Sequence, residues 1–331
     1  MNLFVITGVC QSGSDINLLL PRFLARAKCQ ILLWIDFKDV ADYSRNADAV
    51  RVKCPQANLR CAPRAMWGAA SIVLSMLEAI DICVQDFTSW DRIIFCSIHD
   101  VPLASCDDLL RNLASEWNFD YCGSRWNTSS WDVLRSIELT PVADILHTAR
   151  SYRTYRPRPD ISLKIENELA NIYTAEAVNS LRLCNDLYER FLVAAWAFPP
   201  QGTLVVRRMS RSRAIERLDF FSNYGLIAGR QWCVLGRRFC ELLLSFESGD
   251  LFYMFEDVVI PDECFFQTVA DHYALRGTIT VRWDNIYHAD AQNLRIDKAM
   301  LTKLIRGAGR QKLLARKGDI SVNNETLERL L

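Results

Sequence analysis

Residues 93–98 are Ile93-Ile94-Phe95-Cys96-Ser97-Ile98, a short apolar run that the carboxylate of Asp100 follows. A run of this length, bounded by polar residues, is typical of a strand that is buried on both faces. Residues 3–7 and 31–35 form two similar runs, the second of which ends at Asp36. The sequence therefore predicts three buried strands in the first 100 residues.

The segments between these runs have helical periodicity. Residues 15–27 and 66–84 carry apolar side chains at spacings of three and four residues, which predicts two helices. Alternating strands and helices indicate an α/β fold with a mostly parallel central sheet flanked by helices. Ligands of such sheets bind beyond the carboxyl ends of the strands, so residues 8–14, 36–39 and 99–103 are expected to line one crevice.

Composition sets the broad class of the protein. The chain has 331 residues, 39 Lys and Arg against 39 Asp and Glu, and half of its residues are apolar. This balance predicts a globular protein with one large domain or two modest ones. Zero net charge disfavours nucleic acid or an anionic membrane as the main partner, although a local basic site stays open.

The cysteines and the amino terminus bear on localisation. None of the 12 cysteines forms a Cys-x-x-Cys pair, so a structural zinc site is not expected. The first residues lack the pattern of a signal peptide, and no window of eighteen uncharged apolar residues follows, so no transmembrane segment is expected. We expect buried free thiols and a cytoplasmic location; a secreted disulfide scaffold is the alternative.

Three regions are expected along the chain: an α/β half over 1–124, a variable helical and loop insertion over 125–220, and a second half over 221–331 with a basic segment near its end. In the insertion, residues 150–159 form a basic loop with two prolines, which is either a surface loop or a lid over an anion. Residues 163–196 predict one or two helices. The last third predicts strands at 231–235 and 277–283, helices from 237 and from 261, and a helical tail.

The most informative motif is Pro261-Asp262-Glu263-Cys264-Phe265-Phe266-Gln267-Thr268. Proline followed by two carboxylates is a good helix start, because the acids offset the positive end of the helix dipole. The same geometry suits a general base, since a carboxylate on a rigid helix start is well positioned to take a proton. Both interpretations are open at this point.

Positive charge is concentrated near the end of the chain. Residues 295–317 hold eight Lys and Arg and one acid, a net charge of +7. A solvated helix face is the usual explanation. An anion site is the alternative, because a departing diphosphate needs cations where no metal neutralises it.

Several common motifs are absent from the sequence. It has no Gly-x-Gly-x-x-Gly, no P-loop and no Gly-x-Ser-x-Gly elbow. The four histidines are scattered, and His99 is either a structural residue or part of the crevice. No Asp-x-Asp follows a strand, which is the usual way to hold a divalent ion and a nucleotide diphosphate.

Five motifs in order resemble one glycosyltransferase family. They are Trp67-Gly68-Ala69-Ala70-Ser71, Phe95-Cys96-Ser97-Ile98-His99-Asp100-Val101-Pro102-Leu103, Gly229-Arg230-Gln231-Trp232-Cys233-Val234-Leu235, the motif at 261–268, and Leu314-Ala315-Arg316-Lys317. The series resembles the core-2/I-branching β-1,6-N-acetylglucosaminyltransferases and the related peptide O-xylosyltransferases. The sequence departs from their pattern at Ile98-His99, where Gly-Gln is usual, and at Gly318, where an aromatic residue is common.

The resemblance implies a GT-A-like fold and an inverting transfer that needs no bound metal. Residues 1–124 would then be the nucleotide-sugar-binding half, and residues 221–331 the acceptor and catalytic half. Glu263 would be the general base, and Arg282, Arg316 and Lys317 would take the charge of the donor diphosphate. The other donor-side residues that the resemblance implies are Asp36, near the nucleoside, together with Trp67 and Asp100. Trp232 and Asp262 would lie beside the acceptor.

The sequence thus predicts an enzyme that moves a sugar, GlcNAc or xylose, from a UDP-sugar to a hydroxyl of a glycan or another acceptor, with no cofactor. Two other functions stay open. One is a catalytically silent relative that binds a nucleotide sugar or glycan. The other is sugar transfer to a modified nucleic-acid base, which the arginines at 150–158 and 207–213 suggest and the zero net charge disfavours.

Overall fold

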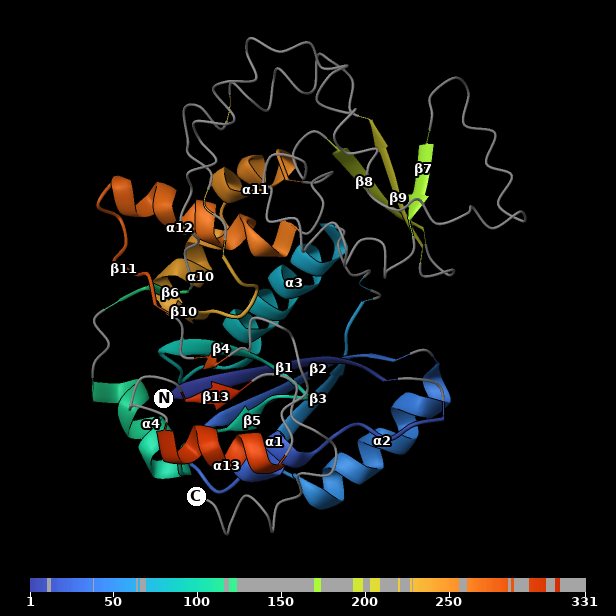
Figure 1. The fold of residues 1–331 in the computed structure, drawn as a ribbon, viewed down its shortest axis with the longest axis vertical. Coiled ribbons are helices and arrows are strands. Elements are labelled where there is room, and N and C mark those ends of the chain that lie inside the picture. The colour runs from blue at the N-terminus through green and yellow to red at the C-terminus, as the bar shows by residue number, and fades with distance from the viewer. Residues whose placement is uncertain are drawn as a thin grey trace.

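The computed structural model describes the strands and helices that build a central sheet and its surroundings (Figure 1). The described residues are 1–10, 13–37, 39–63, 65, 70–115, 119–123, 170–173, 193–198, 203–208, 220, 227, 229–255, 261–284, 287–288, 298–307 and 313–315.

The central sheet has seven strands in the order β11-β6-β10-β4-β1-β2-β3. Their bounds are β1 Asn2–Cys10, β2 Gln30–Phe37, β3 Ala57–Cys61, β4 Arg92–Ser97, β6 Tyr121–Cys122, β10 Val234–Gly236 and β11 Val281–Arg282. Within this described sheet β10 alone is antiparallel to its neighbours, and every other pair is parallel. The expected α/β fold with a mostly parallel sheet is confirmed.

The three predicted strands form the middle of the sheet because they are apolar on both faces. In β1, residues 3–6 are fully buried, and residues 93–96 of β4 are equally inaccessible. A strand with two apolar faces needs a cover on both sides, which a parallel sheet obtains from its crossover helices. The apolar runs therefore determine the layered arrangement.

Helices cover both faces of the sheet. Figure 1 shows α3, α10, α11 and α12 above it and α1, α4 and α13 below it. The bounds are α1 Leu19–Leu24, α2 Val40–Lys53, α3 Ala70–Asp86, α4 Cys106–Ser115, α10 Arg237–Leu243, α11 Phe246–Tyr253, α12 Phe265–Leu275 and α13 Lys298–Gly307, with the 3-10 helix η2 at Pro261–Glu263. Crossover connections are right-handed, so helices that follow strands added in opposite directions lie on opposite faces.

The first predicted helix is much shorter than residues 15–27 suggest. It covers Leu19–Leu24, with Pro21 in its first turn. A helix that began at Asp15 would place Pro21 in its interior, where proline removes a hydrogen bond and clashes with the preceding turn. The residues before α1 bind elsewhere instead, since Ile16 N donates to Asn46 Oδ1 at 2.8 Å.

The prediction of helices over 163–196 is wrong where the structure describes that region. It contains the strands β7 Ala170–Tyr173 and β8 Val193–Phe198, which both pair with β9 Thr203–Arg208 in an antiparallel sheet of three strands. Branched and aromatic side chains favour pleated strands. The partner strand β9 supplies Thr203, Val205 and Val206, and β8 supplies Val193, Trp196 and Phe198. The basic loop at 150–159 lies outside the described residues.

A third small sheet joins distant parts of the chain. It has the order β12-β13-β5, with β5 at Val101–Pro102, β12 at Tyr287–His288 and β13 at Leu314–Ala315. Ala315 pairs with Val101, the residue directly after Asp100. The segment near the carboxyl terminus thus lies against the end of β4.

Most of the described cysteines are buried, as expected, and all of them are free thiols. Burial raises the pKa of Cys29 to about 12 and that of Cys106 to about 11, so both thiols stay protonated at neutral pH. Cys83, Cys233 and Cys240 behave in the same way, because burial raises the pKa of each. These side chains act as small apolar residues of the core.

Replacing Gly236 with alanine is expected to lower stability. A Cβ at this position would lie 2.9 Å from Asp120 Cα, a backbone atom that cannot move aside cheaply. We expect a loss of about 1–3 kcal/mol in the free energy of unfolding, measured by urea denaturation. Gly249→Ala in α11 is the control, because its Cβ meets nothing within 4 Å. Equal stability of the two variants would contradict the close approach of β10 to Asp120.

Candidate functional site

The order of the strands marks one edge of the sheet as the place for a ligand. From β1 the chain adds β2 and β3 on one side, and then returns to add β4 on the other side. In open α/β sheets, ligands bind at the carboxyl ends of the strands where the direction of addition reverses. The candidate site therefore lies beyond the carboxyl ends of β1 and β4.

Two predicted donor-side residues lie at this edge, on either side of β1. Asp36 pairs with Val9 near the end of β2 and is 9% exposed. Asp100 follows β4 and is 1% exposed; its Oδ2 accepts a hydrogen bond of 2.7 Å from Ser97 N. Asp100 N also donates to Ser97 O at 2.9 Å. Asp100 therefore closes the turn after β4, a structural role that it has whatever else it binds.

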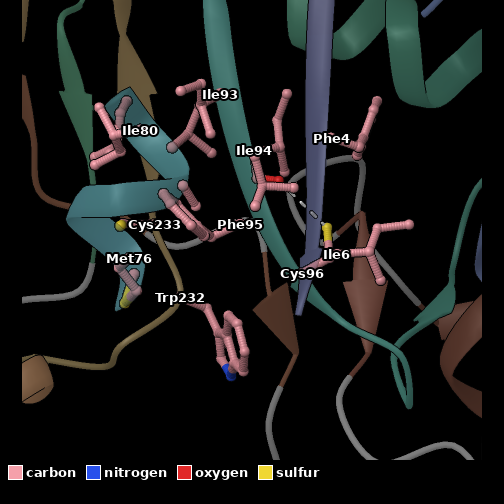
Figure 2. Packing of buried hydrophobic residues seen from close by; sticks show 14 of the residues in the cluster. Phe4, Ile6, Met76, Ile80, Ile93, Ile94, Phe95, Cys96, Trp232 and Cys233 are labelled. Carbon is pink, nitrogen blue, oxygen red and sulfur yellow. Dashed lines mark hydrogen bonds between the residues drawn. The ribbon is translucent and has the colours of Figure 1, made fainter. Parts of the chain in front are cut away.

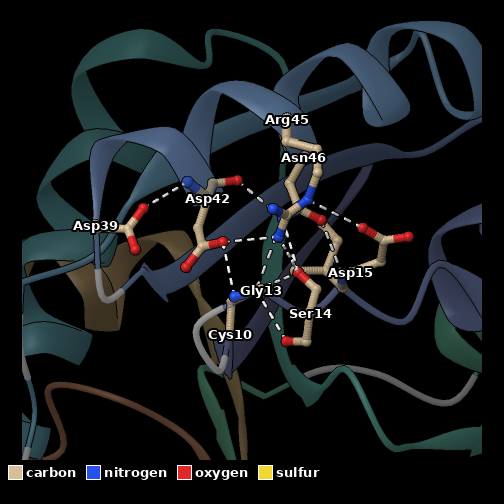
Figure 3. A network of polar contacts seen from close by, with 9 residues as sticks. Cys10, Gly13, Ser14, Asp15, Asp39, Asp42, Arg45 and Asn46 are labelled. Atoms are coloured by element: carbon tan, nitrogen blue, oxygen red, sulfur yellow. Dashed lines mark hydrogen bonds and ion pairs between the residues drawn. The ribbon is translucent and has the colours of Figure 1, made fainter.

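A polar network that the sequence did not reveal holds the loop after β1 (Figure 3). Asp39 caps α2, because its Oδ1 accepts from Asp42 N at 2.7 Å. Asp42 Oδ1 in turn accepts from Gly13 N at 3.0 Å and from Arg45 Nη2 at 2.7 Å. The same Arg45 nitrogen donates to Ser14 O at 2.7 Å. The loop beside Asp36 is thus fixed to the first turns of α2.

The charge of Asp42 is part of this network. Burial by itself would raise the pKa of Asp42, but the hydrogen bonds from Gly13 N–H and Arg45 outweigh it and lower the pKa. The carboxyl group therefore stays ionised at neutral pH and accepts from both donors, Gly13 N and Arg45 Nη2. The sequence does contain a signal for this network. Asp39 is a helix-capping residue, Asp42 follows it by three positions, and Arg45 follows Asp42 by three.

Trp232 lies at the same edge because β10 is antiparallel. Val234 pairs with Ile94, and Phe95 N donates to Cys233 O at 3.2 Å, so the residues before β10 run past the carboxyl end of β4. Trp232 is 5% exposed. Figure 2 shows its indole at the border of the buried cluster, with the ring nitrogen on the side away from Phe95 and Met76.

Asp262 and Glu263 lie in the 3-10 helix η2, directly before α12, and η2 packs against α3. Their side chains are 3% and 1% exposed. The helix start expected at Pro261 is therefore present, with a 3-10 turn before the α-helix. Glu263 O accepts from Gly229 N at 2.8 Å, which connects the 3-10 turn to the segment that carries Trp232. The structure thus brings Glu263, Asp262 and Trp232 into one region.

Arg282 lies at the other end of the sheet. Its strand β11 is an edge strand, five positions from β2 in the strand order, which is roughly 24 Å at the usual strand spacing. Arg282 Nη2 contacts Asp284 Oδ2 at 3.2 Å, and its side chain is 33% exposed. Because α12 packs against β11, Arg282 is on the side of Glu263 rather than that of Asp36. A single ligand that touches both Asp36 and Arg282 must extend along the whole edge.

Three predicted donor-side residues, Trp67, Arg316 and Lys317, lie outside the described residues, as do Arg295, Arg310 and Lys312 of the basic segment at 295–317. What the structure does describe is β13, which ends at Ala315 beside Val101. His99 is exposed, and its backbone N donates to Ser97 Oγ at 3.2 Å.

Within the described residues, no group of three or more His, Cys, Asp or Glu side chains is arranged to hold a metal ion. None of the helices in the described ranges has the length and apolar character that crossing a bilayer requires.

Comparisons with known proteins include a distant likeness to a solved structure. No protein-family model matches the chain, and no curated protein matches it. Among solved structures it is similar to the apo structure of WbbM, a bifunctional glycosyltransferase, with 12% sequence identity and a TM-score of 0.38. The match covers 97% of this chain and 46% of that one, so the chain spans less than half the length of this structure.

Asp42→Asn is expected to reduce the dependence of stability on pH. Because the folded state lowers the pKa of Asp42, its stabilising effect is present above the unfolded value of about 3.9 and is lost as pH falls through the lower folded value. Urea unfolding should therefore separate wild type from the variant more at pH 7 than at pH 3. Asp48→Asn, at an exposed position of the same helix, is the control. A difference that does not change with pH would contradict the role of the Asp42 charge.

Proposed function

We propose that the chain is an inverting glycosyltransferase with a GT-A-like fold, which moves a sugar from a UDP-sugar to a hydroxyl of a glycan or another acceptor and forms a β-linkage without a bound metal. GlcNAc and xylose are the proposed sugars. The observation that carries the proposal is the position of Glu263. Its side chain is buried, and its backbone carbonyl accepts from Gly229 N in the segment that carries Trp232 beside the carboxyl end of β4. The proposed reaction is that of the core-2/I-branching family, which the five sequence motifs resemble.

In the proposed reaction the acceptor oxygen attacks C1 of the donor sugar from the face opposite the diphosphate. The new C–O bond forms as the bond from C1 to the diphosphate oxygen breaks, and its electron pair leaves with UDP. Glu263 takes the proton of the attacking hydroxyl, since a carboxylate within hydrogen-bonding reach of that proton acts as a general base. Attack from the opposite face inverts the configuration at C1.

The departing diphosphate gains negative charge that must be stabilised. We assign this task to Arg282, Arg316 and Lys317, because fixed cations stabilise charge that develops in the transition state. The ion pair of Arg282 with Asp284 is partly exposed, so it contributes little to stability and can exchange one anion for another. Donor binding would then replace Asp284 by phosphate oxygens on the guanidinium.

The two acceptor-side residues have different tasks in this proposal. Trp232 offers a flat ring at the border of the core, on which an apolar face of a sugar can stack, and an indole N–H that donates. Asp262 offers a carboxylate, which accepts hydrogen bonds from sugar hydroxyls. The two residues would orient the acceptor so that only one hydroxyl approaches Glu263.

Glu263→Gln should stop transfer while the donor still binds. An amide cannot take the proton, so we expect kcat to fall about 10²–10⁴-fold or more, with the Kd for UDP nearly unchanged. Transfer is followed by UDP release, and binding by calorimetry. Glu241→Gln is the matched control, because Glu241 lies on the exposed side of α10. Undiminished transfer by Glu263→Gln would refute the role of Glu263, and donor binding by wild type without any turnover would indicate a silent relative instead.

Transfer should be independent of divalent metal. Cations of the protein are proposed to neutralise the diphosphate, so excess EDTA should leave the rate within about twofold of the untreated rate, because no metal-held electrostatic contribution is lost. UDP release is measured with EDTA alone and after addition of Mn²⁺ or Mg²⁺. Loss of activity in EDTA that Mn²⁺ restores would contradict this part of the proposal.

A further inference from the structure

Two polar side chains lie inside the apolar start of α12. Gln267 and Thr268 are fully buried, and they follow Phe265 and Phe266, which are also fully buried. An amide or hydroxyl in such surroundings costs free energy unless it forms hydrogen bonds. Both side chains bind the same neighbouring segment, residues 227–232, of which residue 228 is outside the described part.

The contacts follow one another along this segment. Thr268 Oγ1 accepts from Ile227 N at 3.0 Å and donates to Ile227 O at 3.3 Å. Gly229 N donates to the backbone of Glu263 at 2.8 Å, and Gln267 Nε2 donates to Arg230 O at 2.8 Å. Thus α12 and the 3-10 turn before it clamp the segment at three successive places.

The other end of the segment is held by different elements. Gln231 Nε2 lies 3.8 Å from Met76 Sδ in α3, and Cys233 O accepts from Phe95 N of β4 at 3.2 Å. Trp232 is therefore fixed between the clamp on one side and the sheet on the other. Loss of the clamp would free only the side that faces Glu263.

The stability of the fold alone does not explain why a polar side chain, Gln267, is buried at this position. Its Oε1 is buried and has no hydrogen-bond partner within the described residues. An apolar side chain of similar size would fill the same volume without burying an unpaired oxygen. Polar groups that are imperfectly satisfied in a core are expected mainly where a function needs them.

We infer that Gln267 and Thr268 are positioning residues that hold the segment 227–232 so that Trp232 keeps a fixed relation to Glu263. Neither side chain needs to touch the substrates. The inference rests on the proposed function only for its last step, in which a fixed Trp232 orients the acceptor relative to the base. Gln267 and Thr268 would therefore affect acceptor use and leave donor binding unchanged.

The test uses two variants that keep the volume of the side chain and remove its hydrogen bonds, Gln267→Leu and Thr268→Val. Thr268→Ser keeps the hydroxyl and serves as the conservative rescue. Gln85→Leu, at an exposed position of α3, controls for the change from glutamine to leucine. Thermal melts identify any variant that fails to fold. If Gln267→Leu fails to fold, the comparison of Thr268→Val with Thr268→Ser tests the inference by itself.

Transfer kinetics are the first readout. Gln267→Leu and Thr268→Val should each raise the KM for acceptor about tenfold, the effect of one hydrogen bond, while the Kd for UDP and the rate of donor hydrolysis without acceptor stay within about twofold. Thr268→Ser and Gln85→Leu should behave as wild type. An unchanged KM for acceptor, or an equal loss of donor binding, would overturn the positioning role.

Amide hydrogen exchange is the second readout, and it does not depend on activity. Exchange of Ile227 and Gly229, followed by mass spectrometry, should be faster in Gln267→Leu and Thr268→Val and unchanged in Thr268→Ser. Unchanged exchange in both variants would refute the clamp itself. A wild-type chain that binds no nucleotide sugar would overturn the proposed function and the acceptor step, whereas hydrogen exchange would still decide whether the clamp exists.

Discussion

The direction of strand β10 is the constraint on which the candidate site depends. Among the strands of the described central sheet it alone runs against its neighbours, and it pairs with β4 on one side and β6 on the other. Its beginning, rather than its end, therefore lies at the carboxyl edge of the parallel strands. A parallel β10 would have placed Trp232 at the opposite edge, far from Asp100. The same strand joins the last third of the chain to the sheet that the first third begins.

The parts of the fold that could be predicted from the sequence are those that burial alone determines. Strands β1, β2 and β4 are apolar on both faces, and α3 has apolar residues at helical spacing, so local pattern suffices for them. The apolar pattern does not predict helix α2, because the buried residues of this helix are Asp42, Asn46 and Val50. Their spacing is helical, but two of the three are polar and bind the loop after β1. A pattern of apolar residues cannot reveal a helix whose inner face is hydrophilic.

The candidate site could be predicted residue by residue but not as an arrangement. Glu263 and Trp232 stand in motifs that are visible in the sequence. Their connection runs through a backbone carbonyl of Glu263 and the amide of Gly229, and backbone groups leave no signal in the residue type. The separation of Arg282 from Asp36 follows from the strand order, which depends on pairings between distant segments. Local sequence patterns therefore indicate the individual candidate residues, whereas the topology of the sheet determines which of them lie close together.

The turn at Asp100 indicates which part of a bound nucleotide sugar would lie beside this carboxylate. After this turn, Val101 and Leu103 pack with Leu301 and Ala315 in a small buried cluster, so the end of β4 and the segment before Arg316 are held together by apolar contact. A carboxylate accepts hydrogen bonds from hydroxyl groups, whereas it repels phosphates. If the proposed function holds, Asp100 would therefore accept hydrogen bonds from hydroxyl groups of the donor sugar. The diphosphate would be bound by the proposed cations instead.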